Sequence, residues 1–215
     1  MNPHAKETGL ALLRASQYVF ALLHLLLGAE PSAALLKTAS HDDSLRTVLL
    51  LDRAEPGSAG GLYEVLKNAA PGEPQRLEAM KDEYTRLFLG PDHLSAPPWE
   101  SVYTSPERLL FQKSILDVRR RYRKHGLLPV GYPRTADDHV SLLLHFPALL
   151  YERAADALEA EDIPLCRGLL TDAYQFETEH LLNWLSGYAA DMEPLPAKIF
   201  YPRLVQALLP FLEGS

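Results

Sequence analysis

The spacing of its apolar residues is the feature that most restricts what this chain can fold into. Leucine, alanine, valine and phenylalanine recur three and four positions apart almost throughout, and prolines stand where such runs begin or end. This period is typical of helices that bury one face, and the alternating pattern of strands does not occur. We therefore predict an all-α protein, a bundle of about nine or more helices in two lobes joined by a short hinge. The predicted helices cover residues 5–27, 32–38, 42–52, 61–69, 75–89, 106–125, 138–160, 164–187 and 196–212.

Local signals mark the ends of several predicted helices. Asp42 is expected to cap one helix, and Ser105 before Pro106 gives the start of another, an N-cap followed by a first-turn proline. Gly126 is expected to end that second helix. The segment 126–133 contains two glycines and two prolines and is the best candidate for a hinge. The predicted organisation is an N-terminal lobe over 1–125, the hinge over 126–133 and a C-terminal lobe over 134–215.

The helix predicted over 75–89 ends at a Gly-Pro pair. Leu87 and Phe88 continue its apolar repeat up to that end. Gly90 is expected to cap the helix in the left-handed conformation, and Pro91 prevents continuation. The chain must therefore turn directly after two large apolar side chains.

The loop that follows is stiff and aromatic. Pro97 and Pro98 favour extended backbone in the residues before them, and Trp99 and Tyr103 come next in the sequence. Either ring alone would more often belong to a core, because aromatic side chains contribute strongly to core packing. Their place behind two prolines favours a binding surface instead. Glu100, between them, is expected either to add negative charge for a basic ligand or to be an ordinary exposed glutamate.

Asp137, Asp138 and His139 stand where the helix 138–160 is expected to begin. An aspartate at a helix start caps free amide groups and contributes about 1 kcal/mol, which accounts for one aspartate and not for the histidine. An enzymatic interpretation makes Asp138 and His139 a dyad or metal ligands, although adjacent helical side chains diverge. A binding interpretation has them accept hydrogen bonds from arginines of an apolar peptide.

Several other residues are expected to be structural. His180 and Trp184 are four positions apart on one predicted helix and are expected to pack in the core. Cys166, among leucines at helical spacing, is expected to be a small core residue. The arginines at 119–121 are expected to form a solvated helix face. Phe200–Tyr201 should hold the last helix against the bundle.

The order of these motifs closely resembles the TorD/DmsD/NarJ family of cytoplasmic chaperones for molybdenum-containing redox enzymes, in its TorD/DmsD branch. An aromatic-x-x-Leu-Phe helix, a Gly-Pro stop, a Pro-Pro-Trp-x-Ser-x-Tyr loop, Asp-Asp-His, His-x-x-x-Trp and Phe-Tyr follow one another over most of 80–201. One departure is Thr135-Ala136, where the family usually has Glu-Pro, so we expect a less fixed loop there. The resemblance implies a signal-peptide site that includes the Asp-His pair. The candidate peptide-binding residues are Leu87, Phe88, Pro97, Pro98, Trp99, Tyr103, Asp138 and His139.

Composition limits the class of partner and the compartment. A chain of 215 residues with 47% hydrophobic content can build a substantial core. A net charge of −7 argues against nucleic acid as the main partner and is compatible with a basic peptide. The resemblance supplies such a peptide, because twin-arginine export signals join two arginines to an apolar stretch. The single cysteine allows no intrachain disulfide, so we expect a reducing, cytoplasmic compartment.

The apolar run Tyr18–Leu27 is expected to be a buried first helix. It is shorter than the about 20 apolar residues that span a membrane, and it contains His24. The sequence Gly28-Ala29-Glu30 is a poor match to a signal-peptide cleavage site. We therefore expect neither a membrane anchor nor secretion.

Marks of common enzyme classes are missing from the sequence. It has no Gly-x-x-x-x-Gly-Lys, Gly-x-Gly-x-x-Gly or Gly-x-Ser-x-Gly motif, and no His-x-x-x-His or Cys-x-x-Cys spacing, so no metal and no cofactor are expected. The resemblance implies a chaperone, not an enzyme, that binds the leader and/or the body of a molybdopterin oxidoreductase precursor until its cofactor is inserted. It also implies that two chains can form a domain-swapped homodimer through the hinge. The alternative is a helical hydrolase, metal-dependent or not, that uses Asp138 and His139.

Overall fold

The described part of the chain is helical throughout in the computed structural model. That part comprises residues 2–70, 72–90, 94–105, 113–129, 136–195 and 199–214. Within it the chain forms eleven α-helices and two π-helical segments, and its strand-type pairing is one isolated bridge. The predicted all-α bundle of nine or more helices is therefore confirmed. The elements are α1 (Pro3–Gly28), α2 (Ala33–Ala39), α3 (Asp42–Ala54), α4 (Gly60–Lys67), α5 (Pro74–Tyr84), η1 (Thr85–Leu89), α6 (Glu100–Thr104), α7 (Lys113–Lys124), α8 (Val140–Glu159), α9 (Ile163–Glu177), η2 (Thr178–Leu182), α10 (Asn183–Met192) and α11 (Tyr201–Glu213).

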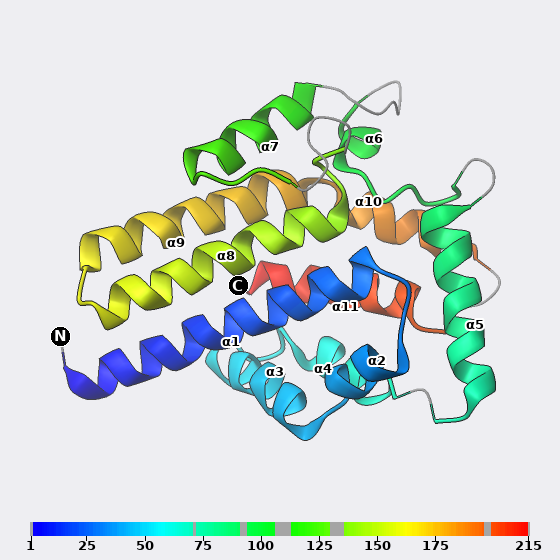
Figure 1. The fold of residues 1–215 in the computed structure, drawn as a ribbon, viewed down its shortest axis with the longest axis horizontal. Helices are drawn as coiled ribbons and strands as arrows, with labels where there is room; N and C mark the ends of the chain where they lie inside the picture. The colour runs from blue at the N-terminus through cyan, green and yellow to red at the C-terminus, as the bar shows by residue number, and fades with distance from the viewer. Residues whose placement is uncertain are drawn as a thin grey trace.

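Three long helices, α1, α8 and α9, form the body of the molecule. Figure 1 shows them side by side along the long axis, with α8 in contact with both others. Helices α1 and α8 run antiparallel, because Gly9 near the start of α1 approaches Leu158 while Gly28 at its end approaches Ser141. At both glycines a Cβ would lie 3.1–3.2 Å from a side chain of α8. Small residues at its two ends therefore let α1 pack closely along α8.

Helix α1 also has the length and composition of a membrane-spanning helix, by those two criteria alone. Eight of its residues are buried in the fold, and Val19, Phe20 and Leu23 have no exposed surface. A single apolar helix near the N-terminus that packs in a protein core meets the same criteria. The expectation of a buried first helix agrees with this packing.

Residues from both sides of the predicted hinge contribute to one hydrophobic core. Helix α1 lies along α8, and α4 contacts α11. Gly126 ends α7 with a positive φ of 69°, as expected, and residues 130–133 lie outside the described part. The division into 1–125, 126–133 and 134–215 stays a prediction. Core predictions for Cys166, Trp184, Phe200 and Tyr201 are confirmed, because each is at most 5% exposed.

Two predicted helices are interrupted by a π-helical turn. The helix predicted over 75–89 is α5 followed by η1, and the helix predicted over 164–187 is α9, η2 and α10. At the end of η1 the Gly90 N–H donates to the Thr85 carbonyl at 2.8 Å, five residues back. Gly90 has φ 13° and ψ 142°, so the expected left-handed cap is wrong. Apolar spacing did not reveal these turns because a π turn adds a single residue to the helix.

Most other helix boundaries were predicted to within two residues. The exceptions are α10, which continues to Met192 instead of ending at 187, and α11, which begins at Tyr201 instead of 196. The short helix α6 was expected to be part of a loop and was not predicted.

Two capping residues also differ from the prediction. His41, rather than Asp42, caps α3, because its Nδ1 accepts the Asp43 N–H. Ser105 is the C-cap of α6. The helix start predicted at Pro106 lies outside the described residues, which resume at 113.

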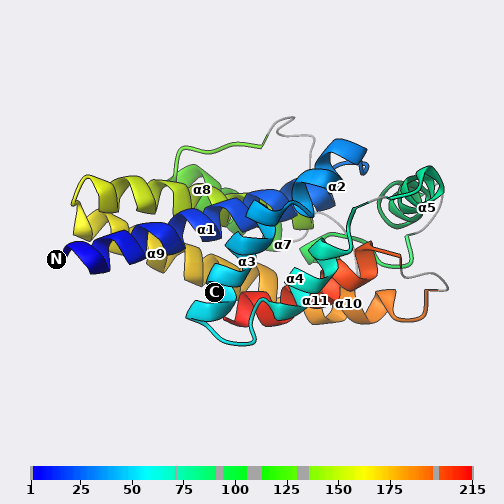
Figure 2. The ribbon, with the colours of Figure 1, turned by 90° about the horizontal axis from the view of Figure 1, so that it is seen from below.

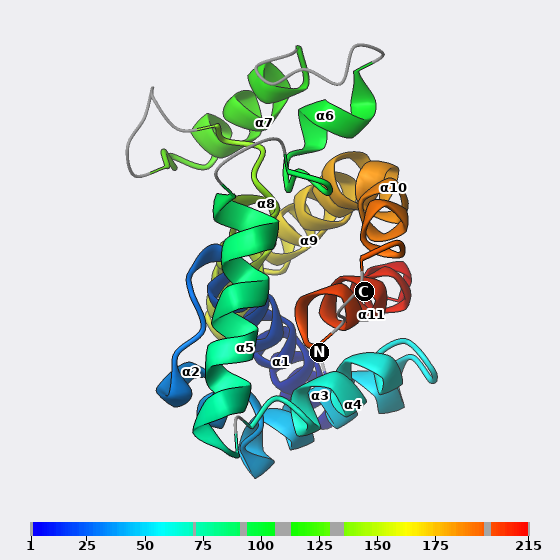
Figure 3. The ribbon, with the colours of Figure 1, turned by 90° about the vertical axis from the view of Figure 1, so that its right-hand side faces the viewer.

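A buried glutamate joins α5 to the start of α11. Glu83 is 1% exposed, and its carboxylate accepts the N–H groups of Ile199, Phe200 and Tyr201 at 2.7, 2.8 and 2.9 Å. Free N–H groups at a helix start favour a negative charge, so Glu83 caps α11 from another helix. Figures 2 and 3 show the consequence, with α5 standing across the end of the long helices.

Replacing Glu83 by alanine should destabilise the protein by about 3 kcal/mol, because buried N–H groups lose a charged acceptor. The matched control is Glu78→Ala on the same helix, whose side chain is 65% exposed and should contribute little. Urea denaturation of both variants measures the difference. Equal stability of the two variants would contradict the capping role.

Candidate functional site

The aromatic loop is joined to the start of α8 by a short antiparallel bridge. The Val140 N–H donates to the Pro98 carbonyl at 2.8 Å, and the Glu100 N–H donates to the Asp138 carbonyl at 3.1 Å. Trp99 and His139 are the bridged pair between these two hydrogen bonds. The Pro-Pro-Trp loop and the Asp-Asp-His element are far apart in sequence, but these backbone hydrogen bonds hold them together.

The Asp138 side chain strengthens the same connection. It has no exposed surface, and its Oδ2 accepts the Ser101 N–H at 2.8 Å at the start of α6. Burial raises the pKa of Asp138, although the hydrogen bond from Ser101 opposes this. In this structure the carboxylate thus holds the loop and does not face solvent.

Five rings form an aromatic cluster next to the bridge: Tyr84, Phe88, Trp99, His139 and Tyr201. Phe88 stacks on Tyr84 with ring centroids 4.7 Å apart and meets the edge of Tyr201 at 5.3 Å. His139 lies 5.5 Å from Trp99 and 6.3 Å from Phe88. Tyr84, Phe88 and Tyr201 are buried, whereas Trp99 and His139 are partly exposed. The solvent edge of the aromatic cluster is therefore made by the bridged pair.

The predicted site residues fall into two groups. Phe88, Trp99, Asp138 and His139 come together, and the buried Leu87, Pro97 and Pro98 belong to the segments that carry them. Tyr103 lies apart from the aromatic cluster: its ring stacks on Trp184 at 5.4 Å and approaches Gly187 of α10. These contacts do not show whether the residues bind a peptide, so their peptide-binding role stays a prediction.

His139 is the N-cap of α8, a position expected for the aspartates before it. Its Nδ1 accepts the Ser141 N–H at 3.2 Å and lies 2.8 Å from the Ser141 hydroxyl. Burial, with a smaller contribution from the nearby His24, lowers the pKa of His139 from 6.5 to about 4. The ring is therefore neutral near pH 7, and because Nδ1 is an acceptor, the proton lies on Nε2. His139 can offer a ligand one hydrogen-bond donor.

Two of the three arginines at 119–121 pair with acidic side chains outside α7, so the expected solvated helix face is wrong for these two and correct for Arg120. Arg119 forms an ion pair with Asp137, which has no exposed surface. Arg121 pairs with Glu179 of η2, whereas the Arg120 side chain is 75% exposed. Sequence could not reveal these pairs, because the partners lie far apart along the chain.

Glu100 and His180 form a buried network with Asp117. Glu100 is 2% exposed, so the alternative of an exposed surface glutamate is wrong. His180 Nδ1 lies 3.1 Å from the Glu100 carboxylate, and Nε2 lies 3.0 Å from Asp117 Oδ2. Burial alone would lower the pKa of His180, but these carboxylates outweigh it and raise the pKa above 6.5. The network fastens the start of α6 to α7 and to η2.

Comparison with known proteins assigns the chain to a family. The nitrate reductase delta subunit family model matches residues 52–190, more than half of the chain. The chain belongs to the TorD/DmsD family of redox-enzyme maturation chaperones. It is 32% identical over 123 residues to a Haemophilus influenzae protein named "Probable Tat proofreading chaperone DmsD", covering 57% of this chain and 53% of that protein. It thus matches about half the length of that relative.

Two further comparisons agree with this family. The chain is 29% identical to the chaperone protein TorD of a Psychrobacter species over 162 residues, which cover 74% of this chain and 70% of that one. A crystal structure assigned to a redox enzyme maturation protein of Archaeoglobus fulgidus superposes with a TM-score of 0.51 at 21% identity. That superposition covers 92% of this chain and 93% of the other and shows a shared fold.

The geometry of the described residues gives little support to the hydrolase alternative. Among the described residues, no hydrogen bond joins Asp138 to His139, since their side chains meet Ser101 and Ser141 respectively. Asp117, Glu179 and His180 do place ligand atoms within 4.8 Å of one another. Arginines already pair with both carboxylates, so a metal ion would have to displace cations. The family members named above are chaperones.

Replacing His180 by glutamine should remove a pH-dependent part of the stability. The folded-state pKa of His180 is raised, so its proton stabilises the fold fully below the ordinary value of 6.5 and ever less as pH rises through the folded value. The difference in unfolding free energy between wild type and His180→Gln should therefore shrink with rising pH. Urea denaturation across that range measures it, with the exposed His4→Gln as control. Parallel curves for wild type and His180→Gln would disprove the proton linkage.

Proposed function

We propose that this protein is a cytoplasmic chaperone that holds the precursor of a molybdopterin-containing redox enzyme by its twin-arginine leader until the cofactor is inserted. The observation that carries the proposal is the solvent edge of the aromatic cluster, where Trp99 and His139 lie together on a rigid bridge. Family membership supplies the class of partner. In this proposal the chain performs no catalysis and needs no metal or cofactor.

The apolar part of a leader suits the exposed side of this cluster. Partly buried aromatic rings that are backed by other rings bind apolar side chains without much ordering of their own. A micromolar dissociation constant corresponds to about −8 kcal/mol, which a few such contacts can supply while still allowing release. Tight packing of Phe88 against Tyr84 and Tyr201 keeps the surface preformed.

The residues that would bind the polar part of the leader differ from those expected from sequence, which were Asp138 and His139. Asp138 is buried and positions the loop, and His139 has a donor to offer, which suits a peptide carbonyl better than an arginine.

Glu30 is an exposed carboxylate two residues after Gly28, which packs against Ser141 at the start of α8. Its charge also helps to raise the pKa of Tyr84 and Tyr201, which burial raises most. We assign Glu30 as the acceptor for a leader arginine.

Recognition of the client's folded body and a domain-swapped homodimer also belong to the proposal. In such a dimer, α1 of one chain would lie along α8 of the other, because the connection at 126–133 separates these helices in sequence. Comparing a leader peptide with leaderless client separates recognition of the leader from recognition of the body.

Trp99→Ala should weaken the binding of a synthetic twin-arginine leader by roughly 2–4 kcal/mol, the range for a central aromatic anchor, with little loss of thermal stability. Titration followed by tryptophan fluorescence should show a blue shift in wild type, and Trp184, which is 2% exposed, should respond little. Calorimetric titration of the same variant gives its affinity. A large drop in melting temperature with unchanged affinity would show that Trp99 is a core residue.

Glu30→Gln should weaken binding of the twin-arginine leader by up to about fivefold, the scale of one exposed ion pair. It should leave the affinity for a twin-glutamine version of the same peptide unchanged. Glu152→Gln, an exposed glutamate on α8, is the matched control. Equal losses for both peptides would place the arginines elsewhere.

A further inference from the structure

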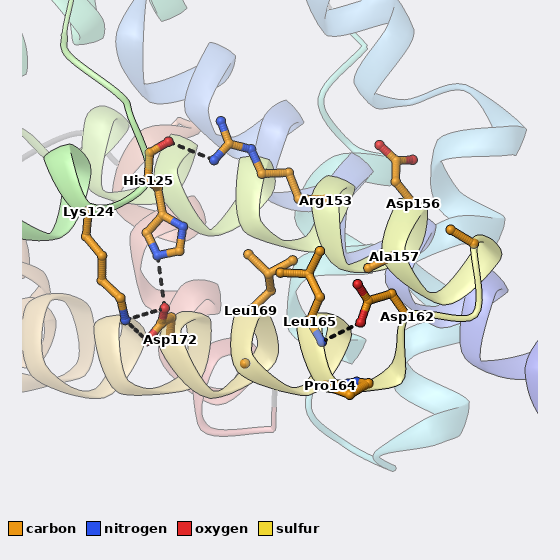
Figure 4. A pocket seen from close by; sticks show the side chains of 12 residues that line it. Lys124, His125, Arg153, Asp156, Ala157, Asp162, Pro164, Leu165, Leu169 and Asp172 are labelled. Carbon is orange, nitrogen blue, oxygen red and sulfur yellow. Dashed lines mark hydrogen bonds and ion pairs between the residues drawn. The ribbon is translucent and has the colours of Figure 1, made fainter.

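A second concave surface lies between α8 and α9, beside the end of α7. This α8–α9 groove encloses about 770 Å³, and Figure 4 shows its lining side chains. Arg153 follows His139 by fourteen positions on α8, or about 20 Å at the rise of an α-helix. The groove is therefore separate from the aromatic cluster.

The floor of the α8–α9 groove is apolar and open. Leu165 is 52% exposed, and Leu169 and Ala157 lie beneath it with exposures of 6% and 5%. Gly168 adds a notch, since a Cβ built there would have no atom within 4 Å. A leucine beside such a notch can receive an apolar side chain from another molecule.

Among the described residues that line the groove, Arg153 is a cation without an ion pair to a carboxylate. Lys124 is neutralised by Asp172, with Nζ–Oδ distances of 2.7 and 2.6 Å. The Arg153 guanidinium donates to the His125 carbonyl at 2.8 Å, and in the described part of the chain no carboxylate forms an ion pair with it. A backbone carbonyl thus holds Arg153 in place, and its guanidinium remains available for an ion pair with a ligand carboxylate.

The opposite end of the groove is acidic. Asp162 Oδ1 accepts the Leu165 N–H and caps α9, and Asp156 pairs with Arg14 of α1 at 2.7 Å. A ligand carboxylate is therefore favoured at the Arg153 end and disfavoured near Asp162. This asymmetry would orient a bound segment.

We propose that the α8–α9 groove binds an amphipathic helical segment of a partner protein, with an apolar stripe on the floor and one carboxylate on Arg153. The groove between two antiparallel helices is a shape that a third helix can fill. Charge complementarity selects the acidic residue, because a charge-assisted hydrogen bond to arginine is among the stronger polar contacts. The α8–α9 groove does not depend on the leader site.

The probe is a synthetic helix of about 15 residues, the length at which isolated helices become marginally stable, with leucines at i, i+3 and i+7 and one glutamate. A second peptide has glutamine in place of that glutamate. NMR spectra of the full-length protein should show shifts at Leu165 and Leu169 with the first peptide. The second peptide should bind about tenfold more weakly.

Two variants test the contacts separately. Arg153→Gln should bind both peptides with the weaker affinity, so the glutamate loses its advantage. Gly168→Leu should fill the notch and abolish binding of both peptides, and a Cβ at this position meets no atom of the fold within 4 Å. Gln175→Leu, at an exposed position of α9 outside the groove, is the matched control and should bind like wild type.

The proposal is overturned if neither peptide shifts Leu165 and Leu169, if wild type does not distinguish glutamate from glutamine, or if Gly168→Leu binds normally. Circular dichroism of each variant checks folding, and Gly168→Ser provides a milder replacement if the leucine variant does not fold. Binding of a leader peptide to Gly168→Leu should be unchanged. Absence of leader binding to wild type would count against the proposed function alone.

Discussion

The backbone pairing of residues 98–100 with 138–140 is the interaction on which the candidate site depends. Two hydrogen bonds and the buried Asp138 carboxylate hold the aromatic loop against the start of α8. Trp99 and His139 are neighbours for that reason alone, since 40 positions separate them in sequence. Removing the pairing would leave the ring of Trp99 on an unattached loop. The family motifs Pro-Pro-Trp and Asp-Asp-His are thus halves of one structural unit.

The buried charged side chains of this fold mainly connect helices to one another. Glu83 caps α11 from α5, Glu100 and Asp117 hold His180 between α6 and α7, and Asp137 receives Arg119. Each of these carboxylates has at least one hydrogen bond or ion pair that offsets part of the cost of its burial, and among the described residues Asp137 Oδ1 is the oxygen of this set left without a hydrogen-bond partner. The residues left to face a ligand at the proposed leader site are consequently a neutral histidine, a tryptophan and peripheral charges.

Sequence reasoning predicted the helical fold and most helix limits, because apolar spacing and proline positions report on local geometry. The aromatic loop and the Asp-Asp-His element were recognised through a family resemblance. Long-range partners were not predictable: nothing local to His180 indicates Glu100. A clue did exist for Glu83, which lies three residues after Met80 and four before Leu87, on the apolar face of its helix. The position of the proton on His139 could be assigned only from the structure, because the assignment rests on the hydrogen bond that the Ser141 N–H donates to Nδ1.

The π turn η1 makes the length of this helix part of the site. Each residue of an α-helix advances the chain by about 100° around the helix axis. The one extra residue of a π turn therefore rotates the side chains before the turn relative to the side chains after it. Deleting one residue between Thr85 and Leu89 would restore an unbroken α-helix and rotate Glu83 relative to Phe88. The cap on α11 and the stack with Tyr201 could then no longer form together. Sequence alignments of related chains should therefore show substitutions in this segment far more readily than gaps.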